Sequence, residues 1–185
     1  AVHNGADDNA SGVAGILELA EKLSSQKESL KRSILFMAFG AEEMGLIGSN
    51  FFTNNLLVDL KKIKIMINFD MIGRVDSIEK GLVIGGTGTA VEMEDLLKTY
   101  EDNSKISFTH SPEGYGSSDH ASFYASGVPV LFFFTGAHTD YHTPFDDADL
   151  INYKGEKEIL DFAYPIIMGF ATSDQSLTYQ EAELE

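Results

Sequence analysis

Three predominantly apolar runs stand out along the chain, at residues 34–39, 63–69 and 128–134. Each has the length of one strand, and runs with little polar alternation are typical of strands buried on both faces. Shorter apolar segments at residues 82–84 and 106–109 predict a further strand and an edge strand.

Between these runs, apolar residues recur with the spacing of a helix. In residues 11–23 the stripe consists of Val13, Ile16, Leu17, Ala20 and Leu23. Further helices are predicted at residues 46–55, 91–100 and 159–171, the last with a kink at Pro165. Strands that alternate with helices predict an α/β fold, a three-layer sandwich with a mostly parallel, mixed sheet.

The predicted elements occupy residues 1–173, which we interpret as one domain. The remaining residues 174–185 are mostly polar and predict a frayed tail. The glycines within residues 85–88 lack the full spacing of a dinucleotide-binding loop, so we interpret this segment as a turn.

Charge and composition narrow the possible partners. The 185 residues include 29 acidic and 13 basic side chains, a formal net charge of −16. This charge argues against nucleic acid and anionic membranes as partners. The sequence contains no apolar run of about 18 residues, so it predicts no membrane insertion. The chain has no cysteine, which excludes disulfides and thiolate metal ligands. The oligomeric state stays open.

Acidic and histidine residues gather in four stretches, each at the mouth of a predicted element. The stretches are GADDNASG (5–12), GAEEMG (40–45), NFDMIGR (68–74) and HTDYHTPFDD (138–147). Because strand ends meet at one edge of a sheet, we expect these stretches to converge. The candidate side chains are Asp7, Asp8, Glu42, Glu43, Asp70, His138 and His142.

So many carboxylates in one place repel one another unless a cation neutralises them. Carboxylate and imidazole groups without thiolate suit catalytic zinc or another first-row divalent ion. Each residue alone has a simpler interpretation: Asp7 and Asp8 as helix caps, Asp70 as a turn residue, the histidines as loop residues. Their joint occurrence on strand ends favours the metal site.

Together, the four stretches resemble the co-catalytic di-zinc aminopeptidase family, whose relatives include bacterial leucyl-type aminopeptidases, glutamate carboxypeptidase II and the glutaminyl cyclases. The resemblance extends from residue 5 to about residue 153. It implies a zinc-exopeptidase-like fold, a peptide substrate with a free amino terminus, and a secreted or periplasmic location.

The resemblance also implies a ligand set. Asp7 matches the aspartate that bridges the two zinc ions, with a cis peptide bond to Asp8. Glu43 and Asp70 match ligands of different zinc ions. His142 matches the histidine that shares a zinc ion with Glu43.

Catalytic groups follow from the same resemblance. Glu42 matches the general base, which takes a proton from water and returns it to the leaving amine. Tyr115 matches a tyrosine that donates a hydrogen bond to the developing oxyanion. Asp119 and His120 match a Ser-Asp-His stretch that supports the site, whereas no role carries over to His138.

One part of the family pattern is missing. The second zinc ion of the family needs a histidine from a His-x-Asp segment upstream of the GADD stretch, and this sequence opens with AVHNGADD. His3 does not lie in such a segment. We therefore expect a chain that corresponds to the carboxyl-terminal two-thirds of the family domain, with one zinc site complete and the other incomplete.

The sequence thus predicts a metal-dependent aminopeptidase, with two alternatives. One is a glutaminyl-peptide cyclotransferase-like enzyme, which keeps a single zinc ion on a set like Asp7, Glu43 and His142. Such cyclases favour tryptophan around the pocket, whereas this chain has none and Tyr141 precedes His142. The other is a non-catalytic relative, against which the retained acidic set argues.

Overall fold

A mixed four-stranded sheet forms the middle of the molecule. The computed structural model describes residues 2–55, 58–75, 81–101 and 104–182. The strands are β1 Met66–Phe69, β2 Leu82–Gly85, β3 Phe108–Ser111 and β4 Val130–Phe134. They lie in the order β1-β4-β2-β3, with β1 parallel to β4, β2 parallel to β3, and β2 antiparallel to β4. The predicted mixed, mostly parallel sheet is confirmed.

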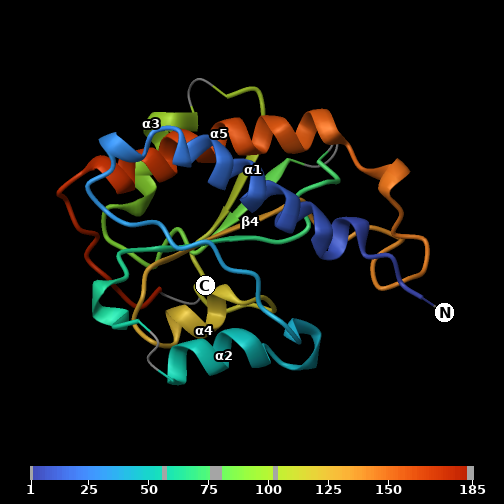
Figure 1. Ribbon diagram of the computed structural model, residues 1–185, viewed down its shortest axis with the longest axis horizontal. Coiled ribbons are helices and arrows are strands. Elements are labelled where there is room, and N and C mark those ends of the chain that lie inside the picture. Colours follow the sequence, from blue (N-terminus) through green and yellow to red (C-terminus); the bar gives the residue numbers. More distant parts are fainter. Residues whose placement is uncertain (1, 56–57, 76–80, 102–103, 183–185) are drawn as a thin grey trace.

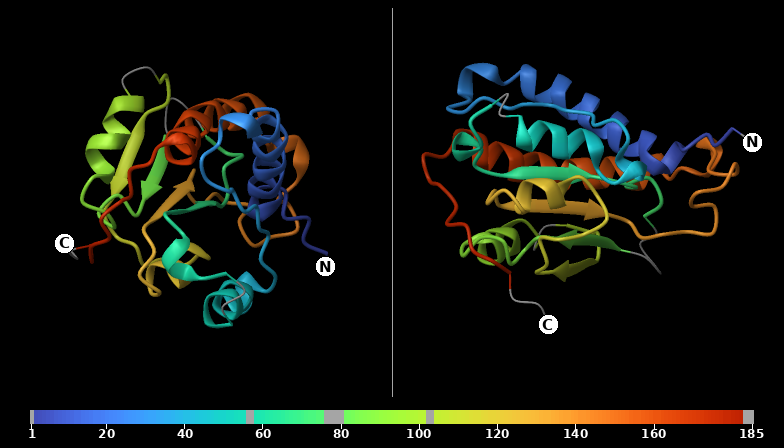
Figure 2. Two further views of the ribbon diagram at one scale, coloured as in Figure 1. Left: turned by 60° about the vertical axis from the view of Figure 1, so that its left-hand side comes forward. Right: turned by 90° about the horizontal axis from the view of Figure 1, so that it is seen from below.

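Helices cover both faces of this sheet (Figure 1). They are α1 Gly12–Ser24, α2 Ile47–Asn54, α3 Met93–Glu101, α4 His120–Tyr124 and α5 Tyr153–Thr172. Helices α1, α3 and α5 lie on one side of the sheet, and α2 and α4 lie on the other, as the turned views also show (Figure 2). The three-layer sandwich is therefore confirmed.

Apolar side chains fill the two spaces between the layers. The larger cluster includes Leu23, Ile84 and Phe133 and lies on the side of α1, α3 and α5. The smaller cluster includes Phe52 and Phe123 and lies on the side of α2 and α4. Removal of this apolar surface from water is the main favourable contribution to folding.

Helix α1 lies directly against the sheet because glycine faces it. A Cβ atom at Gly12 would lie 2.3 Å from the carbonyl oxygen of Phe69. The buried residues of α1 are Gly12, Gly15, Leu19 and Leu23. Val13 and Leu17 of the predicted stripe are instead 41% and 65% exposed. The predicted helix is confirmed, but its buried side is rotated towards the glycines.

Helix α5 is longer than predicted. It begins at Tyr153 because Asn152 caps it, accepting a hydrogen bond from the N–H of Gly155 on its side-chain oxygen at 3.0 Å. It continues through Pro165 as one helix. Even so, no helix within the described residues is long and apolar enough to cross a bilayer.

The predicted strand at residues 34–39 is absent. The segment has no strand assignment, and Leu35 and Phe36 are 59% and 39% exposed. Residues of this segment and of β1 line a common cavity of about 1060 Å³. The prediction was wrong because apolar content alone does not make a strand, whose backbone needs a neighbouring strand to pair with. In the described sheet β1 is an edge strand that pairs with β4 only.

The polar segment that follows α5 does not fray within its described part. Tyr179 forms an isolated β-bridge with Ala90, and the N–H of Thr178 donates to Glu92 at 2.8 Å. Leu177 packs against the larger apolar cluster. The expected frayed end was therefore wrong for residues 174–182, which return along the domain.

We expect Phe133→Ala to lower the free energy of unfolding by about 3–5 kcal/mol, because truncation leaves a cavity in the core. Phe133 is fully buried on β4, which lies between β1 and β2. Phe51→Ala is the matched control, since Phe51 is 60% exposed on α2 and its loss should cost at most about 0.5 kcal/mol. Urea denaturation measures both, and similar losses would contradict this description of the core.

Candidate active site

A cavity of about 500 Å³ opens where β1 and β4 end. Four carboxylates line one part of it, contributed by Asp8, Glu42, Glu43 and Asp70. The rest of the wall is mainly apolar and includes Met71, Phe132 and Phe134. The four acidic and histidine-bearing stretches do converge at one edge of the sheet, as the sequence predicted.

Three side chains in this region could share one metal ion. Ligand atoms of Asp8, Glu43 and His142 all lie within 4.8 Å of one another. Nε2 of His142 lies 2.8 Å from Oε1 of Glu43 and 3.2 Å from Oδ2 of Asp8. Two carboxylates and one imidazole are the ligand count and chemistry of a catalytic zinc site.

The structure brings Asp8, rather than Asp7, to this group. Asp7 is fully buried, and its Oδ1 accepts hydrogen bonds from the N–H of Gly73 at 2.7 Å and the hydroxyl of Ser11 at 3.0 Å. The cis peptide bond likewise joins Asp8 to Asn9, one bond later than expected. The placement expected for Asp7 is thus corrected by one residue, because the side chains of the two adjacent aspartates point in different directions.

Crowding of the carboxylates shifts their protonation. Burial, and then the charges of Glu43 and Asp70, raises the pKa of Asp8 to about 6. Burial, and then the charges of Asp70 and Glu43, raises the pKa of Glu42 to about 7. The pKa of Asp70 is raised as well, by burial before its acidic neighbours. A bound cation would relieve this repulsion, so the acidic set fits a metal ion.

One carboxylate oxygen of Asp70 accepts a hydrogen bond, and the other has no hydrogen-bond partner among the described residues. Its Oδ2 accepts a hydrogen bond from the hydroxyl of Ser118 at 2.7 Å, and that hydroxyl accepts one from the side-chain amide of Asn68 at 2.7 Å. Its other oxygen, Oδ1, is buried with no hydrogen-bond partner among the described residues. An orphaned carboxylate oxygen at an acidic cavity is a natural ligand for a cation.

Left-handed backbone conformations gather around the cavity. Among the described residues, the non-glycine positions with positive φ are Ala41, Leu46, Met71 and His142. Ala41 precedes Glu42 at φ 58°, and Met71 follows Asp70 at φ 54°. Such conformations are unfavourable for residues with a Cβ and cluster at functional sites. Here they turn the chain sharply beside Glu42 and Asp70 and at His142 itself.

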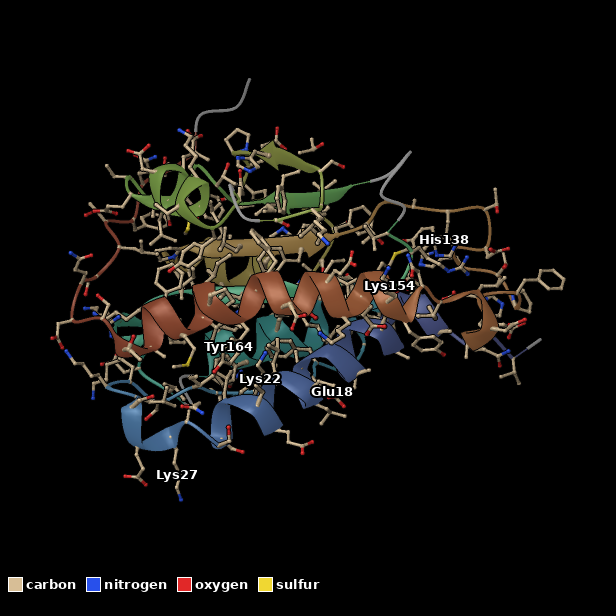
Figure 3. All side chains as sticks on the ribbon, turned by 90° about the horizontal axis from the view of Figure 1, so that it is seen from above. Glu18, Lys22, Lys27, His138, Lys154 and Tyr164 are labelled. Atoms are coloured by element: carbon tan, nitrogen blue, oxygen red, sulfur yellow. The ribbon has the colours of Figure 1, made fainter. Side chains whose placement is uncertain are left out.

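His138 has a partner that the sequence did not reveal. It lies on the loop after β4 (Figure 3), and its Nε2 is 3.2 Å from Oδ2 of Asp7. Its Nδ1 accepts a hydrogen bond from the N–H of Asp140 at 3.2 Å. The interpretation as an ordinary loop histidine therefore missed a buried contact with the GADD stretch. Only spatial proximity reveals such a contact, because 130 residues separate the two.

The remaining predicted site residues are not among those that line this cavity. Tyr115 is 60% exposed and packs edge-on against Tyr124, with ring centroids 4.8 Å apart. His120 is buried and stacks on Phe132 at 4.3 Å, and burial lowers its pKa to about 4. Asp119 is also buried, and its charge contributes to the raised pKa of Glu42.

Comparison with known sequences decides the family. The profile of Peptidase family M28 matches residues 1–167. The chain belongs to peptidase family M28. This confirms the resemblance that the four stretches indicated.

Individual relatives of this M28 chain include named aminopeptidases. Leupeptin-inactivating enzyme 1 of Streptomyces exfoliatus is 37% identical over 134 residues, which cover 72% of this chain and 30% of that protein. The aminopeptidase from Aneurinibacillus sp. strain AM-1 has a TM-score of 0.75 at 31% identity, over 99% of this chain and 42% of that one. The zinc aminopeptidase BSAP from Bacillus subtilis has a TM-score of 0.75 at 26% identity, over 98% and 46%.

This M28 chain therefore spans less than half the length of these relatives. The glutaminyl cyclase of Porphyromonas gingivalis has a TM-score of 0.64 at 17% identity, over 90% of this chain and 63% of that one. Because of its low identity, the cyclase supports the shared fold alone.

Protonation of the acidic set should be measurable in the metal-free protein. A carboxyl group whose pKa is raised by folding destabilises the folded state once it ionises, so the unfolding free energy should fall as pH rises from about 5 to about 8. Glu42→Gln removes the group with pKa about 7. Its stability relative to wild type should therefore increase between these two pH values.

Urea denaturation in the presence of a chelator tests this expectation. Glu21→Gln, at an exposed position of α1, is the control, and its stability difference from wild type should not change with pH. A difference between wild type and Glu42→Gln that stays constant with pH would contradict the crowding of Glu42.

Proposed function

We propose that this chain forms the catalytic core of a metal-dependent aminopeptidase, which hydrolyses the amino-terminal peptide bond of its substrate. The observation that carries the proposal is the grouping of Asp8, Glu43 and His142. Two of these residues, Asp8 and Glu43, line one cavity together with Glu42. Membership of Peptidase family M28 and the named aminopeptidase relatives support it.

Asp8, Glu43 and His142 would hold a divalent ion, and zinc suits two carboxylates with one imidazole. When bound, such an ion polarises the substrate carbonyl and lowers the pKa of a water molecule. Asp70 would contribute its free Oδ1 to a second ion. Within the described residues only one group provides three ligands, so we propose one firm zinc site in this chain.

Glu42 is the proposed general base. Its pKa of about 7 lies near neutral pH, where a group can both accept and return a proton. It lines the cavity next to the ligand Glu43, from a short turn that begins after left-handed Ala41. Glu42 takes a proton from the attacking water and delivers it to the leaving amine.

The cavity also suits the amino-terminal residue of a peptide. Its carboxylates attract a free α-ammonium group, which favours exopeptidase over endopeptidase action. Phe132 and Phe134, stacked with centroids 5.5 Å apart, line the cavity with Met71. These side chains favour an apolar amino-terminal residue. Tyr115 stays the predicted donor to the oxyanion, and its loop contributes Ser117 to the cavity wall.

A second candidate is a single-zinc glutaminyl cyclase. The presence of one three-ligand group in the described chain favours it, whereas the absence of tryptophan from the sequence argues against it. Turnover of aminoacyl-nitroanilides, compared with cyclisation of glutaminyl peptides by the same zinc-loaded preparation, separates the two. Cyclisation without hydrolysis would overturn the aminopeptidase assignment.

We expect Glu42→Gln to lower hydrolysis by about 100-fold or more, because an amide cannot take the proton of water. Bound zinc should be unchanged. Glu94→Gln, at an exposed position of α3, is the control and should retain full activity. Turnover of a leucyl-nitroanilide and metal analysis provide the two readouts. If the variant keeps more than about a tenth of the turnover, Glu42 is not the base.

Metal content tests the ligand assignment. After extensive dialysis, we expect the 185-residue chain to retain about one zinc equivalent, as three protein ligands predict. His142→Ala should remove it, whereas Asp70→Ala should change it little. His110→Ala is the matched control, since His110 lies on β3 and its Nε2 pairs with Oε1 of Glu101 at 2.7 Å. Retention of two zinc equivalents by the wild type would contradict the proposal of a single firm zinc site.

A further inference from the structure

A buried carboxylate outside the ligand set connects the two segments that carry Asp8 and His142. Asp146 is 1% exposed and lies on the loop between β4 and α5, four residues after His142. Its Oδ2 accepts hydrogen bonds from the N–H groups of Asp7 and Asp8, both at 2.9 Å. Its backbone carbonyl accepts a third, from Ala6 at 3.0 Å.

A buried carboxylate is costly unless it is paired, and Arg74 supplies the counter-charge. The Nη2 atom of Arg74 lies 3.3 Å from Oδ1 of Asp146, and its Nη1 atom lies 3.4 Å from Oδ2 of Asp140. Arg74 itself is 15% exposed. Both oxygens of Asp146 are thus acceptors, one for the backbone of the GADD stretch and one for the guanidinium group.

The three hydrogen bonds fix the backbone from which the side chain of Asp8 projects. Asp146 itself lies on the same loop as His142, and Nε2 of His142 is 3.2 Å from Oδ2 of Asp8. The N-terminal segment and this loop lie side by side in all three figures. Asp146 therefore sets the distance between two segments that are far apart in sequence.

We infer that Asp146 is a positioning residue for the metal site, acting through the backbone of Asp8 with Arg74 as its counter-ion. The inference rests on the proposed function for its ligands, and it adds a residue that contacts neither metal nor substrate. Groups that orient ligands from behind typically change metal affinity about 10- to 100-fold when they are replaced.

The charge and not only the shape of Asp146 is required. An asparagine at this position offers one acceptor oxygen and one NH₂ group. If its oxygen accepts from Asp7 and Asp8, its NH₂ group faces the guanidinium of Arg74, where two donors oppose each other. If the asparagine amide is flipped, its NH₂ group instead faces the N–H groups of Asp7 and Asp8, and donors again oppose each other.

Asp146→Asn in the zinc-loaded protein is the test. We expect zinc affinity, measured by competition with a chelator, to fall by about 10- to 100-fold. The visible spectrum of the cobalt-substituted protein should shift, because the carboxylate of Asp8 is reoriented. At saturating zinc, kcat should fall more than KM rises.

Two further variants separate positioning from a general loss of stability. Asp140→Asn removes the other carboxylate on Arg74 but leaves the acceptor of the Asp7 and Asp8 amides intact, so its zinc affinity and cobalt spectrum should match the wild type. Arg74→Gln combined with Asp146→Asn lets the two amides pair with each other. This double variant should recover part of the lost affinity.

The wild-type protein provides a measurement that needs no variant. The N–H groups of Asp7 and Asp8 should exchange slowly with solvent in the metal-free protein, as hydrogen-bonded amides do. Rapid exchange of both, or wild-type zinc affinity and cobalt spectrum in Asp146→Asn, would overturn the inference. Zinc binding without hydrolysis in the wild type would instead contradict the proposed function, and the role of Asp146 would still be tested by affinity.

Discussion

Mutual repulsion among crowded, mostly half-buried carboxylates is the constraint on which the rest of the site depends. Asp8, Glu42, Glu43 and Asp70 line one cavity, and burial together with their shared charge raises the pKa values of Asp8 and Glu42 to about 6 and about 7. The fold would be more stable without this crowding. A cation would turn the same repulsion into affinity, so the destabilised cluster would supply the binding energy of the proposed metal site.

The surrounding structure keeps these groups from separating. Left-handed residues beside the acids and at His142 make sharp turns that point several side chains at one spot. Behind them, Ser118 holds Asp70, and Asp146 holds the backbone of Asp8. A flexible arrangement would relax by moving the charges apart, and a site that relaxes in this way binds metal weakly.

Much of the fold, and the convergence of the acidic stretches at one cavity, followed from short-range sequence patterns. Apolar runs revealed β1 and β4, and four motifs indicated which loops meet. Sequence patterns failed where an element depends on a partner that is distant in the sequence, or where the direction of a side chain decides its role. The run at residues 34–39 is apolar but unpaired, α4 is too short for a helical stripe, and Asp7 and Asp8 are chemically identical neighbours. Asp146 was visible within HTPFDD, but its bond to residue 8 exists only in three dimensions.

Among the described residues, no strand pairs with the outer edge of β1, and this has a consequence for how copies of this chain behave in solution. An unpaired strand edge next to an apolar cavity is a template for strand addition by another chain. The net charge of −16 keeps copies apart by long-range repulsion, which extends only over about 10 Å at 0.1 M salt. Salt therefore weakens the electrostatic repulsion between copies, whereas the edge of β1 stays available for strand addition. We therefore expect the colloidal stability of this chain to fall as ionic strength rises.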